Sequence, residues 1–204
     1  MRLSSKPLTA LLAEFRSSAP TPGGGSAAAL AGALGASLLA MVARLPKPRA
    51  TAEPDHQALQ GVADRSEALA LALETMIDRD ADAYDSVMSA YRLPKGTDEE
   101  KAARSARIQA ALKSAIDTPL EVMRACAAGI SEVPLLLAMG NANAASDVKV
   151  GLELLRAGLR GAHHNVAINL ESVKDEAYRA AVQSESERLA LSESDGAAAP
   201  SGPS

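Results

Sequence analysis

The spacing of apolar residues along the chain predicts a series of helices separated by breaker runs. A short first helix begins around Pro7 and ends near Ser17–Ser18, with one apolar face made of Leu8, Leu11, Leu12 and Phe15. Residues 19–25 follow as a run of Pro and Gly, which interrupts the helical pattern. A second helix is therefore predicted from Ser26 onward.

Residues 26–43 contain no charged side chain. One side of the predicted helix carries Leu30, Leu34 and Leu38, and the nearly opposite side carries Ala28, Gly32, Ala36 and Ala40. This pattern favours a buried central helix, apolar all round, against whose small face other backbones pack closely. The segment just reaches the length of a membrane span, or of a lipid-facing helix dimer. Because Ala and Gly drive membrane insertion only weakly, we favour the buried helix and expect no membrane association.

After a loop at residues 46–54, a long helix is predicted from Pro54 to Leu93. Its apolar seam advances by three or four residues at each step: Leu59, Val62, Ser66, Leu69, Leu73, Met76, Asp80, Ala83, Val87 and Ala90. Asp80 stands on this seam. Burial would raise the pKa of its carboxyl group toward the range useful for a general acid or base. The alternative is a structural Asp80 held by a core partner, such as an arginine or a backbone amide, and the sequence leaves both open.

Prolines and caps divide the second half of the chain. Thr97 and Glu100 form a capping box that begins a helix. Pro119 is expected to kink or break this helix, which then continues to Gly129. Residues 134–139 are predicted as a separate short helix closed by Gly140.

The last long helix is predicted to begin with Ser146 as its N-cap and Asp147 in its first turn. Its seam is Val148, Leu152, Leu155, Leu159, Ala162, Val166, Asn169 and Val173. Residues 191–204 are low in complexity, and we expect this tail to be disordered. One helical domain is therefore expected over residues 1–190.

Composition supports an all-α fold, a single-domain multihelical bundle. Only 2% of the 204 residues are aromatic, and alanine and leucine, both strong helix formers, do most of the packing. The net charge is −4 with no basic stripe, which argues against nucleic-acid binding. The single cysteine, Cys126, is expected in the core, and no spacing of Cys and His predicts a metal site. The absence of an apolar signal-like stretch near the N-terminus favours a cytoplasmic protein.

Three features could carry chemistry. The run Pro22, Gly23, Gly24, Gly25 and Ser26 lies directly before the uncharged helix, where free N–H groups can meet an anion or a carbonyl oxygen. Taken alone, this run also fits a merely flexible loop. Asp80 is the second feature. The third is a set of polar residues in otherwise apolar segments, of which the adjacent histidines are assigned to the surface or an interface: Asn141, Ser146, Asp147, His163, His164, Asn165 and Asn169.

Several motifs, in this order, resemble the C-terminal domain of the formiminotransferase-cyclodeaminase family. They are residues 21–29, 32–36, 41–43 and 77–84, then Pro119-Leu120, Gly140-Asn141, Ser146-Asp147 and 165–169. Residues 93–104 resemble the free-standing bacterial cyclohydrolase branch of that family. The resemblance covers roughly residues 8 to 175. In the segment 45–51 the family usually has a Gly, a basic residue and an aromatic, whereas this chain has two prolines and no aromatic.

The resemblance implies an all-helical homodimer that binds a folate near the subunit interface, with no metal or other cofactor. It implies hydrolysis of 5,10-methenyltetrahydrofolate to 10-formyltetrahydrofolate, with cyclization of 5-formiminotetrahydrofolate and release of ammonia as the alternative. Asp80 is expected to be the base and Asp147 a second catalytic group. The expected substrate-binding residues are Pro22, Gly23, Gly24, Gly25, Ser26, Tyr84, Asn141, Ser146, Asn165 and Asn169. A folate-binding relative without catalysis, or a purely structural helical protein, remains open at this point.

Overall fold

Six α-helices and one short 3₁₀-helix make up the ordered elements of the computed structural model, which describes residues 2–46 and 53–192. The elements are α1 (Leu8–Phe15), α2 (Gly24–Arg44), α3 (Glu53–Tyr91), α4 (Asp98–Met139), η1 (Ala142–Ala144), α5 (Ala145–Leu170) and α6 (Glu176–Leu191). No strand occurs within these described ranges. The prediction of an all-α fold is confirmed.

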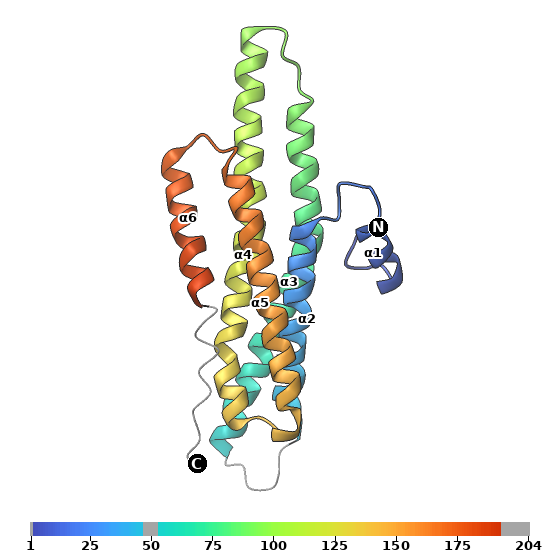
Figure 1. Cartoon of the computed structure of the whole chain (residues 1–204), viewed down its shortest axis with the longest axis vertical. Coiled ribbons are helices and arrows are strands. Elements are labelled where there is room, and N and C mark those ends of the chain that lie inside the picture. Colours follow the sequence, from blue (N-terminus) through green and yellow to red (C-terminus); the bar gives the residue numbers. More distant parts are fainter. Residues whose placement is uncertain (1, 47–52, 193–204) are drawn as a thin grey trace.

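The four long helices α2 to α5 run side by side as an elongated bundle (Figure 1). α2 contacts α3, α4 and α5, so it is the central helix that the uncharged segment predicts. α6 packs along α4 and α5, and α1 lies beside the beginning of α2 (Figure 1). The ends of α3 and α4 that are joined by residues 92–97 project beyond the other helices.

The small face of α2 is buried as predicted. Ala28, Gly32, Ala36 and Ala40 are all in the core. A Cβ at Gly32 would lie 2.7 Å from the Sγ atom of Cys126 on α4, so the two helices approach too closely for a larger residue. The leucine side, however, faces outward, and Leu34 is 53% exposed. The expectation of a helix buried all round is therefore wrong, because the small face gives the closest packing and turns the leucines away from the core.

The seam predicted for α3 is confirmed, because each of its ten members is buried or half-buried. Asp80 lies on it as expected. The loop expected at residues 46–54 is shorter than predicted at its far end, where α3 already begins at Glu53. Residues 47–52 lie outside the described part of the chain.

α4 is not broken at Pro119. It runs without interruption from Asp98 to Met139, with Pro119 and Pro134 in its interior. The predictions of a break and of a separate helix over residues 134–139 are wrong. Proline removes the N–H that would bond the carbonyl of Ala115, and the side chain of Asn169 on α5 replaces that donor at 3.1 Å. A side chain from α5 thus supplies the hydrogen bond that α4 itself cannot make to this carbonyl.

Two further boundaries differ from expectation. Ser146 is not an N-cap; the N-cap of α5 is Ala144, two residues earlier. Asn141 instead caps η1 by accepting a hydrogen bond from the Asn143 amide. α6, whose N-cap is Asp175, was not predicted. This last helix extends through Leu191, and the expected disordered tail otherwise lies outside the described residues.

Two helices, α2 and α4, are long and apolar enough to cross a membrane by length and composition. Core helices of soluble proteins pass the same test, and more than half of the apolar stretch in α2 is buried inside the bundle. This observation is weak evidence for a membrane span.

Candidate active site

The carboxylate of Asp80 lies at the N-terminus of α2. Its Oδ2 atom accepts a hydrogen bond from the backbone amide of Ser26 at 2.8 Å and lies 2.9 Å from the Ser26 hydroxyl. The first amides of a helix have no partners within the helix, and they attract negative charge. Asp80 therefore caps α2 from a different helix, and this contact fixes the position of its carboxylate.

Burial raises the pKa of Asp80, and this effect exceeds the opposing effect of the two hydrogen bonds from Ser26. The hydroxyl of Ser26 lies 2.9 Å from the carbonyl oxygen of Ile77 as well as from Asp80. The single hydroxyl proton of Ser26 can be donated either to the carboxylate of Asp80 or to the carbonyl oxygen of Ile77. If Asp80 is protonated, its own proton can donate to the Ser26 oxygen while the hydroxyl donates to Ile77. The site thus accommodates both protonation states, as a group that takes and returns a proton must.

Gly25 allows the carboxylate to approach this closely. A Cβ at position 25 would overlap with the carboxyl group of Asp80. At Gly24 a Cβ would meet only the side chain of Asn165, at an ordinary 3.5 Å. The three glycines are therefore not equivalent, and Gly25 is the one that the geometry requires.

A cavity of about 380 Å³ opens beside Asp80. Its floor is the glycine run, with Gly23, Gly24 and Gly25. The walls come from α3, α4, α5 and the chain after α5, and include Ala83, Tyr84, Val87, Tyr91, Leu112, Ala115, Asn165, Asn169 and Ser172. Pro20 and Thr21 complete the lining. The cavity combines one buried carboxylate with apolar walls and a few amides, the usual composition of a small-molecule site.

The two amides in this cavity have different partners. Asn165 donates from Nδ2 to the carbonyl of Gly161, one turn earlier in α5, at 2.8 Å. Asn169 donates to Ala115, the carbonyl released by Pro119. In each case one N–H of Nδ2 is engaged, so the amide oxygen and the second N–H remain to bond a ligand.

Most of the predicted site residues come together here. Seven of them line the cavity, namely Asp80, Gly23, Gly24, Gly25, Tyr84, Asn165 and Asn169, and an eighth, Ser26, bonds to Asp80. Pro22 is buried immediately before the glycines.

The structure does not bring the remaining three predicted residues into this cavity. Asn141 donates to the carbonyl of Pro46, at the opposite end of the bundle. Ser146 and Asp147 belong to the first turn of α5, whereas Asn165 lies near its end. Eighteen residues of α-helix separate Asp147 from Asn165, which is roughly 27 Å along the axis. The predicted site residues therefore lie at two opposite ends of the helical bundle.

Several residues that line the cavity were not among those predicted. Val87 and Tyr91 share a face of α3 with Asp80, and Leu112 and Ser172 come from segments that the pattern did not connect to α3. The available signal was helical spacing, because Tyr84, Val87 and Tyr91 follow Asp80 by four, seven and eleven residues. Nothing in the sequence pointed to Leu112 or Ser172.

Other reactive groups lie elsewhere. Cys126 is fully buried, and burial raises the pKa of its thiol to about 12. It is a core residue, as expected. Within the described ranges, no group of three or more His, Cys, Asp or Glu side chains is arranged to hold a metal ion. His163 pairs with the buried Ser186 of α6 at 2.7 Å, whereas its neighbour His164 is exposed.

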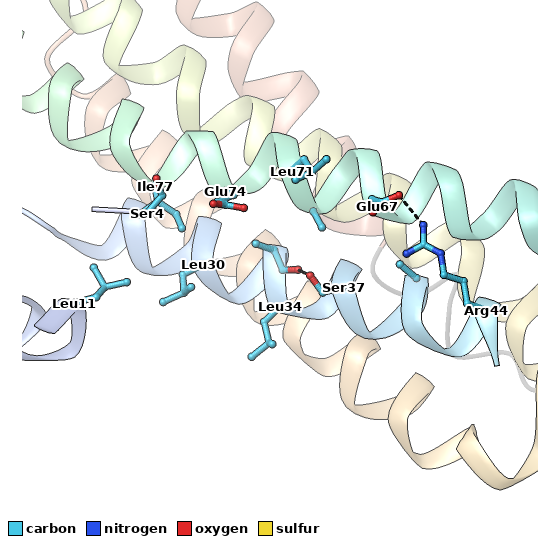
Figure 2. Close-up of a pocket in the computed structure, with 13 residues that line it drawn as sticks. Ser4, Leu11, Leu30, Leu34, Ser37, Arg44, Glu67, Leu71, Glu74 and Ile77 are labelled. Carbon is cyan, nitrogen blue, oxygen red and sulfur yellow. Dashed lines mark hydrogen bonds and ion pairs between the residues drawn. The ribbon is translucent and has the colours of Figure 1, made fainter. Parts of the chain in front are cut away.

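A second hollow lies between α2 and α3. Figure 2 shows the leucines of α2, Leu30 and Leu34, opposite Leu71 of α3, with the ion pair between Arg44 and Glu67 at one end. Leu11 of α1 and Ile77 also line it. We call Leu11, Leu30, Leu34, Leu71 and Ile77 the leucine face.

The fold and site define an α-helical protein that holds a buried carboxylate at a glycine-rich helix terminus, beside a cavity for a small molecule. A family model described as formiminotransferase-cyclodeaminase matches residues 7–188. The chain belongs to that family.

The chain is also similar to individual proteins and a solved structure. It is 47% identical over 165 residues to a methenyltetrahydrofolate cyclohydrolase from Methylorubrum extorquens, covering 79% of this chain and 78% of that protein. It is 34% identical to the formimidoyltransferase-cyclodeaminase of Sus scrofa, of which it spans 34% of the length while 89% of this chain is covered. The crystal structure of a formiminotetrahydrofolate cyclodeaminase from Thermotoga maritima superimposes with a TM-score of 0.84 at 27% identity, covering 95% of this chain and 93% of that one.

Proposed function

We propose that this protein is a methenyltetrahydrofolate cyclohydrolase, which hydrolyses 5,10-methenyltetrahydrofolate to 10-formyltetrahydrofolate. The observation that carries the proposal is the half-buried carboxylate of Asp80, fixed at the N-terminus of α2 and lining an open cavity. The 47% identity to a cyclohydrolase over most of both chains supports the choice of reaction.

The chemistry of the substrate fits this carboxylate. The methenyl carbon joins N5 and N10 as a cationic amidinium, and a carboxylate nearby stabilises that charge. Asp80 takes a proton from water as the water oxygen bonds to the carbon, which gives a neutral tetrahedral adduct. The bond from carbon to N5 then breaks, N5 receives the proton from Asp80, and the hydroxyl proton is released to solvent as the formyl group forms. One water is consumed and one proton is released.

The surrounding residues suit the rest of the ligand. The glycine run leaves room for a flat ring beside the helix terminus, and the amide oxygens of Asn165 and Asn169 can accept hydrogen bonds from its N–H groups. Tyr84, one turn beyond Asp80, offers an aromatic face. Pro22 and Ser26 hold this loop and carboxylate in place. Asp147 lies far from this cavity in the chain, so the proposed reaction uses Asp80 alone.

The direct test compares Asp80→Asn with wild type in an assay that follows loss of the methenyl absorbance, corrected for uncatalysed hydrolysis. We expect kcat to fall by about 100-fold or more, because the variant has no base, while tetrahydrofolate still binds. Asp82→Asn is the matched control, since Asp82 is exposed and lies two residues away on another face of α3. Near-normal turnover by Asp80→Asn would refute the assignment of the base.

A cyclodeaminase is the second candidate function. The observation that favours it is the close superposition on the Thermotoga maritima cyclodeaminase over nearly the whole chain. Closure of 5-formiminotetrahydrofolate passes through a tetrahedral carbon between the same two nitrogens, so the same carboxylate would serve as the acid that assists departure of ammonia. Release of ammonia from that substrate, without accelerated loss of the methenyl compound, would favour this alternative.

We further propose that a second copy of the chain covers the leucine face to form a homodimer. Leu34 and Leu71 are 53% and 58% exposed and line one hollow. α1 adds Leu8 and Leu12, which are exposed because this helix buries only Leu11. Contiguous exposed apolar surface of this kind marks an interface, and a self-complementary face is the commonest basis of a dimer.

The remaining expectations are proposals of the same kind. The match over residues 7–188 supports one helical domain over residues 1–190. We propose that the reaction needs no metal or organic cofactor, because the proton transfers described above require only Asp80 and water. A net charge of −4 supports a protein that binds neither nucleic acid nor an anionic membrane. We also propose that the protein is cytoplasmic.

A further inference from the structure

The ends of α3 and α4 form a projecting two-helix arm, made of residues 81–91 and 98–112 (Figure 1). The arm leaves the bundle at the level of Asp80, where α2 begins. Its α3 side continues the wall of the candidate active site, because Tyr84, Val87 and Tyr91 all line the same cavity as Asp80. The site is therefore elongated along the arm.

The wall along α3 is a continuous stripe. Asp80, Tyr84, Val87 and Tyr91 are separated by four, three and four residues and so share one helical face. Eleven residues of α-helix extend about 16 Å. Tyr84 and Tyr91 are 38% and 43% exposed, and they are two of the three tyrosines in the chain. A stripe of this length and character suits an elongated ligand with an aromatic middle.

A preoriented cation stands at the far end of this stripe. The guanidinium of Arg104 donates from Nε and one terminal nitrogen to the backbone carbonyl of Tyr91, at 3.2 and 2.9 Å. It also lies over the Tyr91 ring, 5.7 Å from the centroid. These contacts leave the second terminal nitrogen available. No carboxylate among the described residues pairs with it, and Glu100, one turn earlier, accepts from the Gly96 and Thr97 amides.

Resting on the proposed function, we infer that the arm is the subsite for the p-aminobenzoylglutamate end of the folate. Tyr84, Val87 and Tyr91 contact the aminobenzoyl ring, and Arg104 binds a glutamate carboxylate. The reacting carbon joins the pterin to the aminobenzoyl ring, so a ligand with this carbon at Asp80 must project its anionic end away from the pterin. The protein presents its groups in the same order as the ligand: the carboxylate of Asp80 for the reacting carbon, the apolar wall for the aminobenzoyl ring, and Arg104 for the glutamate.

Arg104 suits this role physically. An arginine whose guanidinium is already oriented loses less side-chain entropy when it binds an anion, and its bonds to a carboxylate are charge-assisted. The cavity itself contains no lysine or arginine among its lining residues. Arg104 contacts the lining residue Tyr91, so it is placed to distinguish a folate from a pterin that lacks the anionic tail.

The test compares two substrates. One is 5,10-methenyltetrahydrofolate, and the other is its analogue in which a neutral amide replaces the glutamate. We expect the wild-type KM to be about tenfold higher for the analogue, with little change in kcat, because a charge-assisted pair contributes on that scale. Arg104→Gln should raise KM for the folate by the same factor and leave KM for the analogue unchanged.

Two further variants separate charge from structure. Arg104→Lys keeps the positive charge near Tyr91 and should retain most of the preference for the folate. Arg107→Gln, on the same helix but lining a different hollow with Asp85 and Leu93, should alter KM for neither compound. Equal loss on both substrates in Arg104→Gln would mean that Arg104 only supports the arm. Absence of any wild-type preference would also refute the subsite.

Failure of the proposed function gives a different result. If wild-type protein turned over neither compound, the preference would be measured instead as the ratio of Kd values for tetrahydrofolate and its neutral tetrahydropteroyl amide, by calorimetry. Loss of that ratio in Arg104→Gln would support the subsite without the reaction. An unchanged ratio would refute it.

Discussion

The Cα atom of Gly25 and the carboxyl group of Asp80 lie so close together that any side chain at position 25 would overlap with the carboxylate. Gly25→Ala should therefore push Asp80 away from the terminus of α2. Displacement of a catalytic group by about 1 Å costs roughly 100-fold in rate, and we expect kcat to fall on that scale. Steady-state kinetics with 5,10-methenyltetrahydrofolate measure it.

Gly24→Ala is the matched control for this substitution. Its Cβ would meet Asn165 at an ordinary 3.5 Å, and both variants add one methyl group to the same turn. Equal losses of activity in the two variants would show that flexibility of the loop, rather than the position of Asp80, limits the rate.

Ser26→Ala should alter the pH profile of the reaction. The bonds from Ser26 lower the pKa of Asp80, while burial raises it. Removal of the hydroxyl bond should raise this pKa further, so kcat/KM should begin to fall at a higher pH as the solution is acidified. The variant retains the backbone bond from residue 26. A pH profile that coincides with that of wild type would argue against Asp80 as the titrating base.

The same pKa predicts how stability changes with pH. Since burial raises the pKa of Asp80 in the folded protein, the folded state binds this proton more tightly than the unfolded chain. Its contribution to stability is therefore present at acidic pH and lost as pH rises through the raised pKa. Asp80→Asn lacks this loss, so its stability relative to wild type should increase from acidic to neutral pH. Urea denaturation at both pH values measures this difference, and a difference of opposite sign would contradict the assignment.

Asn169 and Pro119 should be energetically coupled through the carbonyl of Ala115. Asn169→Ala leaves that partly buried acceptor without a protein donor and should reduce the free energy of unfolding by about 1 kcal/mol. Pro119→Ala restores the backbone N–H that can bond Ala115 within α4. In that background, Asn169→Ala should cost about 1 kcal/mol less, as measured by a double-mutant cycle in urea. Additive effects would mean that the two residues act independently.

The proposed dimer predicts a change in mass for Leu34→Glu. Burial of a carboxylate in an apolar interface is costly, so this variant should elute as a monomer when wild type elutes as a dimer. Val150→Glu is the control, since Val150 is 52% exposed on α5 and does not line the hollow of the leucine face. Light scattering after size-exclusion chromatography measures both, and a monomeric wild type would refute the dimer.

Helical periodicity predicted the elements that pack through one continuous stripe. The seam of α3 includes Asp80 at a half-buried position, as its spacing indicated. Helix-breaking and capping residues predicted the helix boundaries less well, because contacts with residues distant in the chain also determine where a helix begins or ends. Pro119 does not end α4, because Asn169 bonds the carbonyl that proline leaves free. Ser146 resembles an N-cap but does not cap α5.

The sequence by itself determined the all-α class, the close packing of the small face of α2 and the presence of a carboxylate on a buried seam. These follow from periodicity and side-chain volume, which are local properties. Only the tertiary structure decided that Gly25 and Asp80 meet, that Asp147 lies far from them, and that Leu34 of α2 faces outward. Each of these depends on how one helix is placed against another, and that placement is fixed by packing between residues distant in the chain.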